Sequence, residues 1–83
     1  MITKEKVEQE VFLALHELFE IPMNDLGLDK HIAEDLMLDS IDAVDLIVRL
    51  QDRADVKVNP EEFKSIRTVR DIVDVVTKLV HAA

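Results

Sequence analysis

Apolar residues near the start of the chain recur with the spacing of one face of an α-helix. Their steps are i, i+4, i+7, i+8 and i+11. These positions are Val7, Val11, Ala14, Leu15 and Leu18. Thr3 can cap the start of this helix, and Pro22 disfavours helical geometry at Ile21. The pattern therefore predicts a first helix that starts at Thr3 and ends before Pro22.

Residues 22–39 show no clean helical period and form a connection much longer than usual between two helices. The segment carries more aliphatic side chains than a solvated linker, so we expect it to be pinned onto the core. These side chains are Leu26, Leu28, Ile32, Leu36 and Leu38. Gly27, the only glycine, is expected to supply a tight bend.

Helical spacing resumes from Asp39. One stripe of a second helix is apolar, and three more aliphatic residues lie beside it. The stripe is Ala43, Leu46, Ile47, Leu50 and Ala54, and its neighbours are Ile41, Val44 and Val48. The opposite, charged stripe is Asp42, Asp45, Arg49, Asp52 and Arg53. The pattern predicts a helix with one face in the core and one in solvent.

A further helix start lies in the run Asn-Pro-Glu-Glu at residues 59–62. Asn59 is a capping residue, Pro60 takes the first helical position and Glu62 the third. These residues predict a short third helix, with Phe63 as its anchor.

A second capping pattern, Thr68 with Asp71, predicts the start of a fourth helix. Apolar positions follow at helical steps. They are Val69, Ile72, Val73, Val76 and Val80. Valine favours strands, but no second strand is available, and a lone strand leaves its backbone groups unpaired. The sequence thus predicts an all-α fold, a four-helix up-down bundle with a long first loop and a short third helix.

Length indicates how many domains the chain forms, and net charge indicates which kinds of partner it can bind. The 83 residues, 48% hydrophobic and 34% charged, suit one compact domain over residues 1–83. The net charge of −8 disfavours nucleic acid and anionic membranes as partners and favours basic proteins. The charged first ten residues are unlike a signal peptide, and no stretch has the length of a membrane span. We expect a free-standing, cytoplasmic and monomeric protein.

Motifs for catalysis or metal binding are not found in the sequence. Ser40 lacks the glycines of a nucleophile elbow and has no histidine nearby in sequence. The histidines, at positions 16, 31 and 81, lack the close spacing of a zinc site. The aspartates at positions 35, 39, 42 and 45 lack the spacing and central glycine of a calcium loop. With no cysteine, thiolate metal sites are also excluded. We expect neither a serine hydrolase nor a metal site.

Ser40 stands where the long loop meets the second helix. If Asp39 caps that helix with Asp42 as its third residue, the Ser40 hydroxyl is not needed for the cap. A phosphodiester on this hydroxyl would lie at the positive end of the helix dipole, where an anion is favoured. The alternative is that Ser40 is itself the N-cap, since serine and aspartate both favour helix starts.

The residues around Ser40 resemble those of the acyl carrier proteins. The run Asp-Ser-Ile-Asp at 39–42 is similar to that family's Asp-Ser-Leu motif with its following acid, and the similarity extends along residues 42–46. It also includes the long first loop and the helix starts at 59–62 and 68–71, and so covers nearly the whole chain.

The resemblance implies that Ser40 carries 4′-phosphopantetheine, moved from coenzyme A by a phosphopantetheinyl transferase that uses magnesium. The thiol of this arm would hold an acyl chain as a thioester and present it to fatty-acid or polyketide-type enzymes, while the chain itself catalyses nothing. It also implies that the apolar stripes of the second and fourth helices, with Phe63 and Ile66, line a core that takes up the acyl chain.

In that family, acidic residues on the second helix meet basic patches on acyl-processing enzymes, which implies a docking surface around Ser40. Its residues here are Asp39, Asp42, Asp45, Ile41 and Val44. A plain solvated surface is the alternative. Arg49 and Arg53 interrupt the acidic pattern. They either support the helix through i, i+4 pairs such as Asp45 with Arg49, or discriminate among partners.

Two alternatives to an acyl carrier stay open at this point. A peptidyl, aryl or D-alanyl carrier would use the same arm on the same fold. An acidic helical adaptor would bind basic partners and never be modified.

Overall fold

The structure, a computed structural model, describes residues 3–82 and all of their side chains except those of Pro60, Phe63 and Ala82. Its helical segments are, in order, α1 (Lys4–Phe19), the short 3-10 helix η1 (Met23–Asp25), α2 (Ser40–Ala54), α3 (Pro60–Phe63) and α4 (Val69–Ala82). No strand occurs in residues 3–82, so the predicted all-α class is confirmed. The anchoring role predicted for Phe63 concerns a side chain outside the described residues.

Helix α1 begins and ends close to the predicted residues. The Thr3 hydroxyl oxygen accepts a hydrogen bond from the Lys6 N–H at 3.2 Å, which is the predicted N-cap. The helix ends at Phe19, and Glu20 follows in the left-handed conformation with φ of 55°. Pro22 thus lies three residues beyond the last helical residue.

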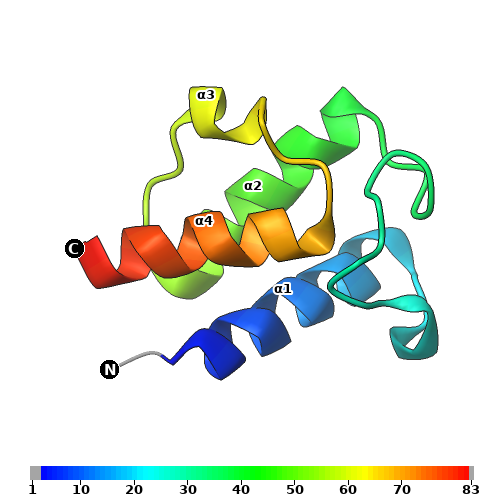
Figure 1. The fold of residues 1–83 in the computed structure, drawn as a ribbon, viewed down its shortest axis with the longest axis horizontal. Coiled ribbons are helices and arrows are strands. Elements are labelled where there is room, and N and C mark those ends of the chain that lie inside the picture. The colour runs from blue at the N-terminus through cyan, green and yellow to red at the C-terminus, as the bar shows by residue number, and fades with distance from the viewer. Residues whose placement is uncertain (1–2, 83) are drawn as a thin grey trace.

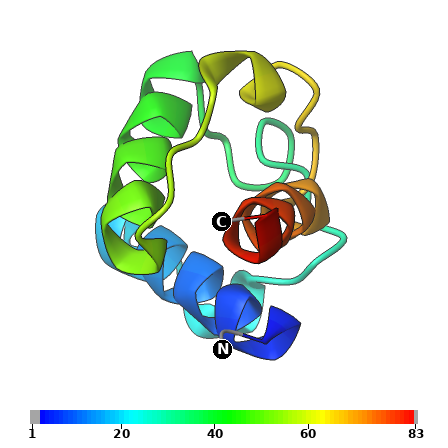
Figure 2. The ribbon, with the colours of Figure 1, turned by 90° about the vertical axis from the view of Figure 1, so that its left-hand side faces the viewer.

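Three long helices form the body of the molecule. Helices α2 and α4 run in the same direction, and α1 runs opposite to both (Figure 1). Viewed from the end, the three surround the core, and the long loop lies at the far end of the bundle (Figure 2). The fully buried side chains at its centre belong to all three helices. They are Val7, Val11, Leu15, Leu46, Leu50, Val69, Ile72 and Val73.

The predicted count of four bundle helices and the strict up-down order are not supported. Helix α3 is a single turn of four residues, whereas α1, α2 and α4 have 14 to 16. The reason for the order is the chain between α2 and α4, residues 55–68, which returns along the molecule so that α4 starts at the same end as α2 (Figure 1). The molecule is a three-helix bundle with one extra helical turn.

The long loop is pinned to the core, as predicted. Its five aliphatic side chains are partly buried against the core. Backbone hydrogen bonds tie it to the start of α4: the Ile32 N–H donates to the Arg67 carbonyl at 3.0 Å, and the Val69 N–H donates to the Lys30 carbonyl at 3.1 Å. These bonds fix the loop end from which Ser40 follows.

The bend predicted at Gly27 is confirmed, but it does not use the conformational freedom of glycine. A turn does start there, since the Lys30 N–H donates to the Gly27 carbonyl at 3.2 Å. The φ of Gly27 is not positive, however, and the left-handed residues among those described are Glu20, Met37 and Asp55. The bend at Gly27 therefore does not require glycine.

The valine-rich segment is helical, as its period predicts. Thr68 and Asp71 form the predicted cap: the Asp71 N–H donates to the Thr68 hydroxyl at 3.3 Å, and the Thr68 N–H donates to the Asp71 carboxylate at 3.1 Å. Hydrogen bonds from the backbone N–H groups of Arg67 and Thr68 hold the pKa of Asp71 below its usual range. Within the described residues, no helix has the length and apolar character that a membrane span requires.

Candidate functional site

Helix α2 starts with a reciprocal cap that leaves Ser40 outside it. The Asp42 N–H donates to the Asp39 carboxylate at 2.9 Å, and the Asp39 N–H donates to the Asp42 carboxylate at 3.1 Å. Asp39 is the N-cap, with extended backbone, and Ser40 is the first helical residue. The predicted cap is confirmed, and the alternative in which Ser40 is the N-cap is wrong.

The Ser40 side chain is exposed at the end of the bundle where α2 starts. Within the described residues, no hydrogen bond engages its hydroxyl, because Asp39 and Asp42 already satisfy the first turn. A serine at this position can lose its proton to an external base and accept a new bond at Oγ without disturbing the helix cap.

A pocket of about 410 Å³ opens beside Ser40. Three segments build it: the end of the long loop, the first two turns of α2, and the link between α3 and α4. Its apolar lining consists of Ile32, Ala33, Leu38, Ala43, Leu46 and Ile66. Its polar lining consists of His31, Glu34, Asp39, Ser40, Lys64 and Arg67. Of the residues predicted to take up an acyl chain, Ala43, Leu46 and Ile66 therefore lie at this pocket, and Leu46 and Ile66 are buried.

The predicted docking residues lie around Ser40 in different environments. Asp39 and Asp45 are exposed, whereas Asp42 is half-buried and engaged in the cap. Ile41 and Val44 are exposed by 72% and 57%, which is unusual for aliphatic side chains of a helix. The structure thus brings acidic and apolar side chains together on the outer face of α2.

Two further exposed apolar residues, one on α2 and one just before it, were not among the predicted docking residues. Val48 is one helical turn beyond Val44 and is 54% exposed; Met37 precedes the helix and is 84% exposed. The helical spacing placed Val48 beside the apolar stripe of this helix, together with Ile41 and Val44. Its exposure could not be predicted, because it depends on how α2 is rotated against the core. Met37 adopts φ of 58°, a left-handed conformation that no local pattern indicates for methionine.

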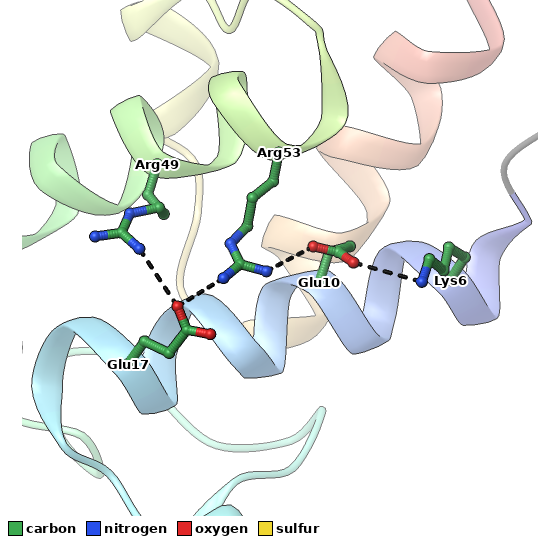
Figure 3. Close-up of polar contacts among 5 residues, drawn as sticks. All are labelled: Lys6, Glu10, Glu17, Arg49 and Arg53. Carbon is green, nitrogen blue, oxygen red and sulfur yellow. Dashed lines mark hydrogen bonds and ion pairs between the residues drawn. The ribbon is translucent and has the colours of Figure 1, made fainter.

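The side chains of Arg49 and Arg53 lie against α1, away from the predicted docking residues on the outer face of α2. Arg53 contacts Glu10 at 2.8 Å and Glu17 at 2.6 Å, and Arg49 contacts Glu17 at 3.4 Å (Figure 3). Lys6 extends the network to Glu10 at 3.6 Å. The hydrogen bond from Arg53 holds the pKa of Glu10 below its usual range, and the same contact raises the pKa of Arg53.

This network changes the interpretation of the two arginines. The anticipated pair of Asp45 with Arg49 is absent from the ion pairs of the described residues. Both guanidinium groups instead neutralise glutamates of the neighbouring helix, so the outer face of α2 keeps its acidic character.

Metal binding has no support in the described residues, which contain no cluster of three or more histidine or acidic side chains arranged to hold an ion. His16 instead closes the end of α1, with Nδ1 2.7 Å from the Ile21 carbonyl oxygen. Asp35 accepts a hydrogen bond from the His31 N–H at 2.7 Å and so stabilises the long loop.

Comparison with known proteins adds independent evidence. A family model described as a phosphopantetheine attachment site matches residues 9–76. An acyl carrier protein 2 of Ralstonia nicotianae is 38% identical over 81 residues, covering 98% of this chain and all of the relative. Acyl carrier proteins of Syntrophobacter fumaroxidans (39% identical; 75% of this chain, 85% of theirs) and Rhodococcus erythropolis (34%; 93% and 85%) are also similar.

The matched region contains α2, its cap and the pocket beside it. Ser40 offers an exposed, unengaged hydroxyl there, which fits a covalent phosphopantetheine arm. The chain therefore belongs to the acyl carrier protein family, whose members bear 4′-phosphopantetheine and carry acyl groups without being enzymes.

Proposed function

We propose that Ser40 is the residue that carries the 4′-phosphopantetheine arm. The observation that carries this proposal is an exposed hydroxyl at the first position of α2, free of the cap and at the mouth of an apolar pocket. A transferase would move the arm from coenzyme A onto this oxygen. The Ser40 oxygen bonds to the pantetheine phosphorus, the bond to the nucleotide bisphosphate breaks, and the hydroxyl proton passes to a base of the transferase.

The arm ends in a thiol that holds an acyl group as a thioester when loaded. The role of this chain is to hold Ser40, and thereby the start of the arm, in a fixed position. The Asp39 cap fixes the first turn of α2, and the bonds of the loop to α4 fix the approach to Ser40. An acyl chain folded back on the carrier would meet Leu46 and Ile66, which are buried and line the pocket. We propose that the cargo comes from fatty-acid or polyketide-type synthesis.

The docking surface belongs to the same proposal. Asp39, Asp42 and Asp45 supply negative charge close to Ser40, and the exposed side chains of Ile41 and Val44 supply apolar area. Partners with basic patches, the transferase and acyl-processing enzymes, would be steered to this face and held by the apolar contacts. We also propose that the carrier acts as a monomeric single domain in the cytoplasm, where it must meet both coenzyme A and its partners.

Modification can be tested by intact mass after incubation with coenzyme A and a broad phosphopantetheinyl transferase. The wild type should gain one arm, and Ser40→Ala should gain none. Ser65→Ala is a matched control, because Ser65 is the other serine of the chain and its hydroxyl donates to the Glu62 carbonyl at 3.1 Å. If only Ser65→Ala failed to gain the arm, the attachment site would be Ser65. If the wild type gained no arm, an unmodified adaptor would be favoured.

Docking can be tested with the transferase as the partner. Asp45 is exposed and outside the cap, so Asp45→Lys should slow arm transfer while the melting temperature stays close to that of the wild type. Asp52→Lys makes the same charge change two turns further along α2 and should slow transfer less. Equal rates for both variants and the wild type would place docking on another face.

A further inference from the structure

The pocket beside Ser40 has one cationic wall. Lys64 and Arg67 come from the link between α3 and α4, and both side chains are exposed. Ser40 lies on the wall formed by the start of α2. The remaining lining includes six apolar side chains, among them the buried Leu46 and Ile66. The pocket therefore suits a group that is anionic at one end and apolar beyond it.

Half of the basic residues form ion pairs within the described part of the chain, and the two cations of this wall belong to the other half. The sequence has ten lysines and arginines for eighteen acidic residues. Five of the ten are paired with carboxylates: Lys4, Lys6, Arg49, Arg53 and Arg70. Lys64 and Arg67 make no such ion pair among the described residues. The Arg67 guanidinium donates a 3.5 Å hydrogen bond to the Lys64 carbonyl, and its charge also acts on the Asp71 carboxylate.

The charged residues that line the pocket act on any anion attached to Ser40. Glu34 and Asp39 also line the pocket, on the loop and at the cap of α2. A negative charge attached to Ser40 is repelled by both of these carboxylates and attracted to the cations of Lys64 and Arg67, which line the same pocket. Lysine and arginine have long, flexible stems whose charged ends can reach across a pocket mouth.

We propose that Lys64 and Arg67 bind the phosphodiester of the arm carried by Ser40 and so hold the first part of the arm over the pocket in the free carrier. This inference rests on the proposed function. It adds a binding site for the arm's phosphate on the carrier itself, made by the α3–α4 link. A partner would then have to draw the phosphate away from Lys64 and Arg67 before it receives the cargo.

The mobility of the arm tests this proposal. The probe is the unloaded arm, isotope-labelled and attached by the transferase, because its phosphodiester is then its only anion near neutral pH. The wild type is compared with Lys64→Gln/Arg67→Gln. The matched control is Lys57→Gln/Lys78→Gln, which removes two exposed cations away from the pocket lining. Intact mass first shows that each protein has gained the arm.

For the part of the arm next to the phosphate, we expect NMR order parameters above about 0.6 in the wild type and the control, and below that in the pocket variant. Raising the salt to about 0.5 M should loosen the wild-type arm towards the level of the variant. Equal mobility in all three modified proteins, or no response to salt, would overturn this inference and leave Ser40 as the site. Failure of the wild type to gain the arm would overturn both.

Discussion

Among single residues, Asp39 has the largest influence on how Ser40 is presented. Its carboxylate accepts the hydrogen bond that starts α2, and losing such an N-cap costs about 1 kcal/mol. Asp39→Ala should therefore lower the free energy of unfolding by about that amount in urea titration. Asp39→Asn keeps the acceptor and should stay near the wild type. Equal stability of Asp39→Ala and wild type would contradict the cap.

At Gly27 a substitution is expected to stabilise the fold, because the backbone there does not use the conformational freedom of glycine. A Cβ added there would meet the Lys30 Cγ at 3.8 Å, an ordinary contact, and φ is not positive. Gly27→Ala should raise the free energy of unfolding by about 0.4–1 kcal/mol, since it restricts the unfolded chain. A lower urea midpoint for this variant would show that the bend needs glycine after all.

Single residues also show what the sequence can predict. The caps at Thr3, Asp39 and Thr68 follow from side-chain type and spacing, because cap bonds form between residues close in the chain. The left-handed conformation of Met37 was not predictable, because methionine has no preference for it and no neighbour in sequence signals it.

At the scale of helices, Arg53 connects α2 to α1 through Glu10 and Glu17. The arginine and Glu10 are about three-quarters buried, so their contact is screened less than most surface pairs. We expect Arg53→Met to cost roughly 1 kcal/mol of unfolding free energy at neutral pH. Arg70→Met is a matched control, because its partner Asp29 is 92% exposed, and it should cost less. A larger loss for Arg70→Met would contradict this ranking.

The same pair predicts a pH dependence. The folded-state pKa of Glu10 is lowered, so its stabilising effect is present above the unfolded pKa of about 4.3 and is lost as the pH falls through the folded value. The stability difference between wild type and Arg53→Met should therefore shrink below about pH 4. Urea titrations over that range measure it, and a constant difference would assign the effect to packing.

The helices themselves were predictable where their pattern is long. The 3.6-residue period of α4 outweighed its valine content, because that period buries one continuous face. The partners of Arg49 and Arg53 were not predictable, since they depend on how α1 and α2 are rotated against each other. Residues more than 30 positions apart in the sequence meet there.

For the whole molecule, charge opposes compactness. A net charge of −8 on 83 residues repels itself, and the paired cations relieve only part of that repulsion. Raising salt from about 0.01 M to about 0.15 M should raise the melting temperature, and magnesium should do so at lower concentration. A flat response to both would contradict a closely spaced acidic surface.

The pocket shows why the candidate site was only partly predictable. Ser40 and its acidic neighbours lie in one short run of sequence, so their association could be predicted. Lys64 and Arg67 reach the pocket from a link that follows Ser40 by more than twenty residues. Their place is set by the bonds between the loop and the start of α4, which exist only in the folded chain.

The central claim is that the arm is attached to Ser40, and peptide mapping tests it most directly. Cleavage after lysine and arginine yields peptide 31–49, in which Ser40 is the only hydroxyl side chain, and separates it from Ser65. After incubation with coenzyme A and the transferase, we predict that the mass of one arm is found on peptide 31–49 alone. An arm found on another peptide, or on none, would contradict the account.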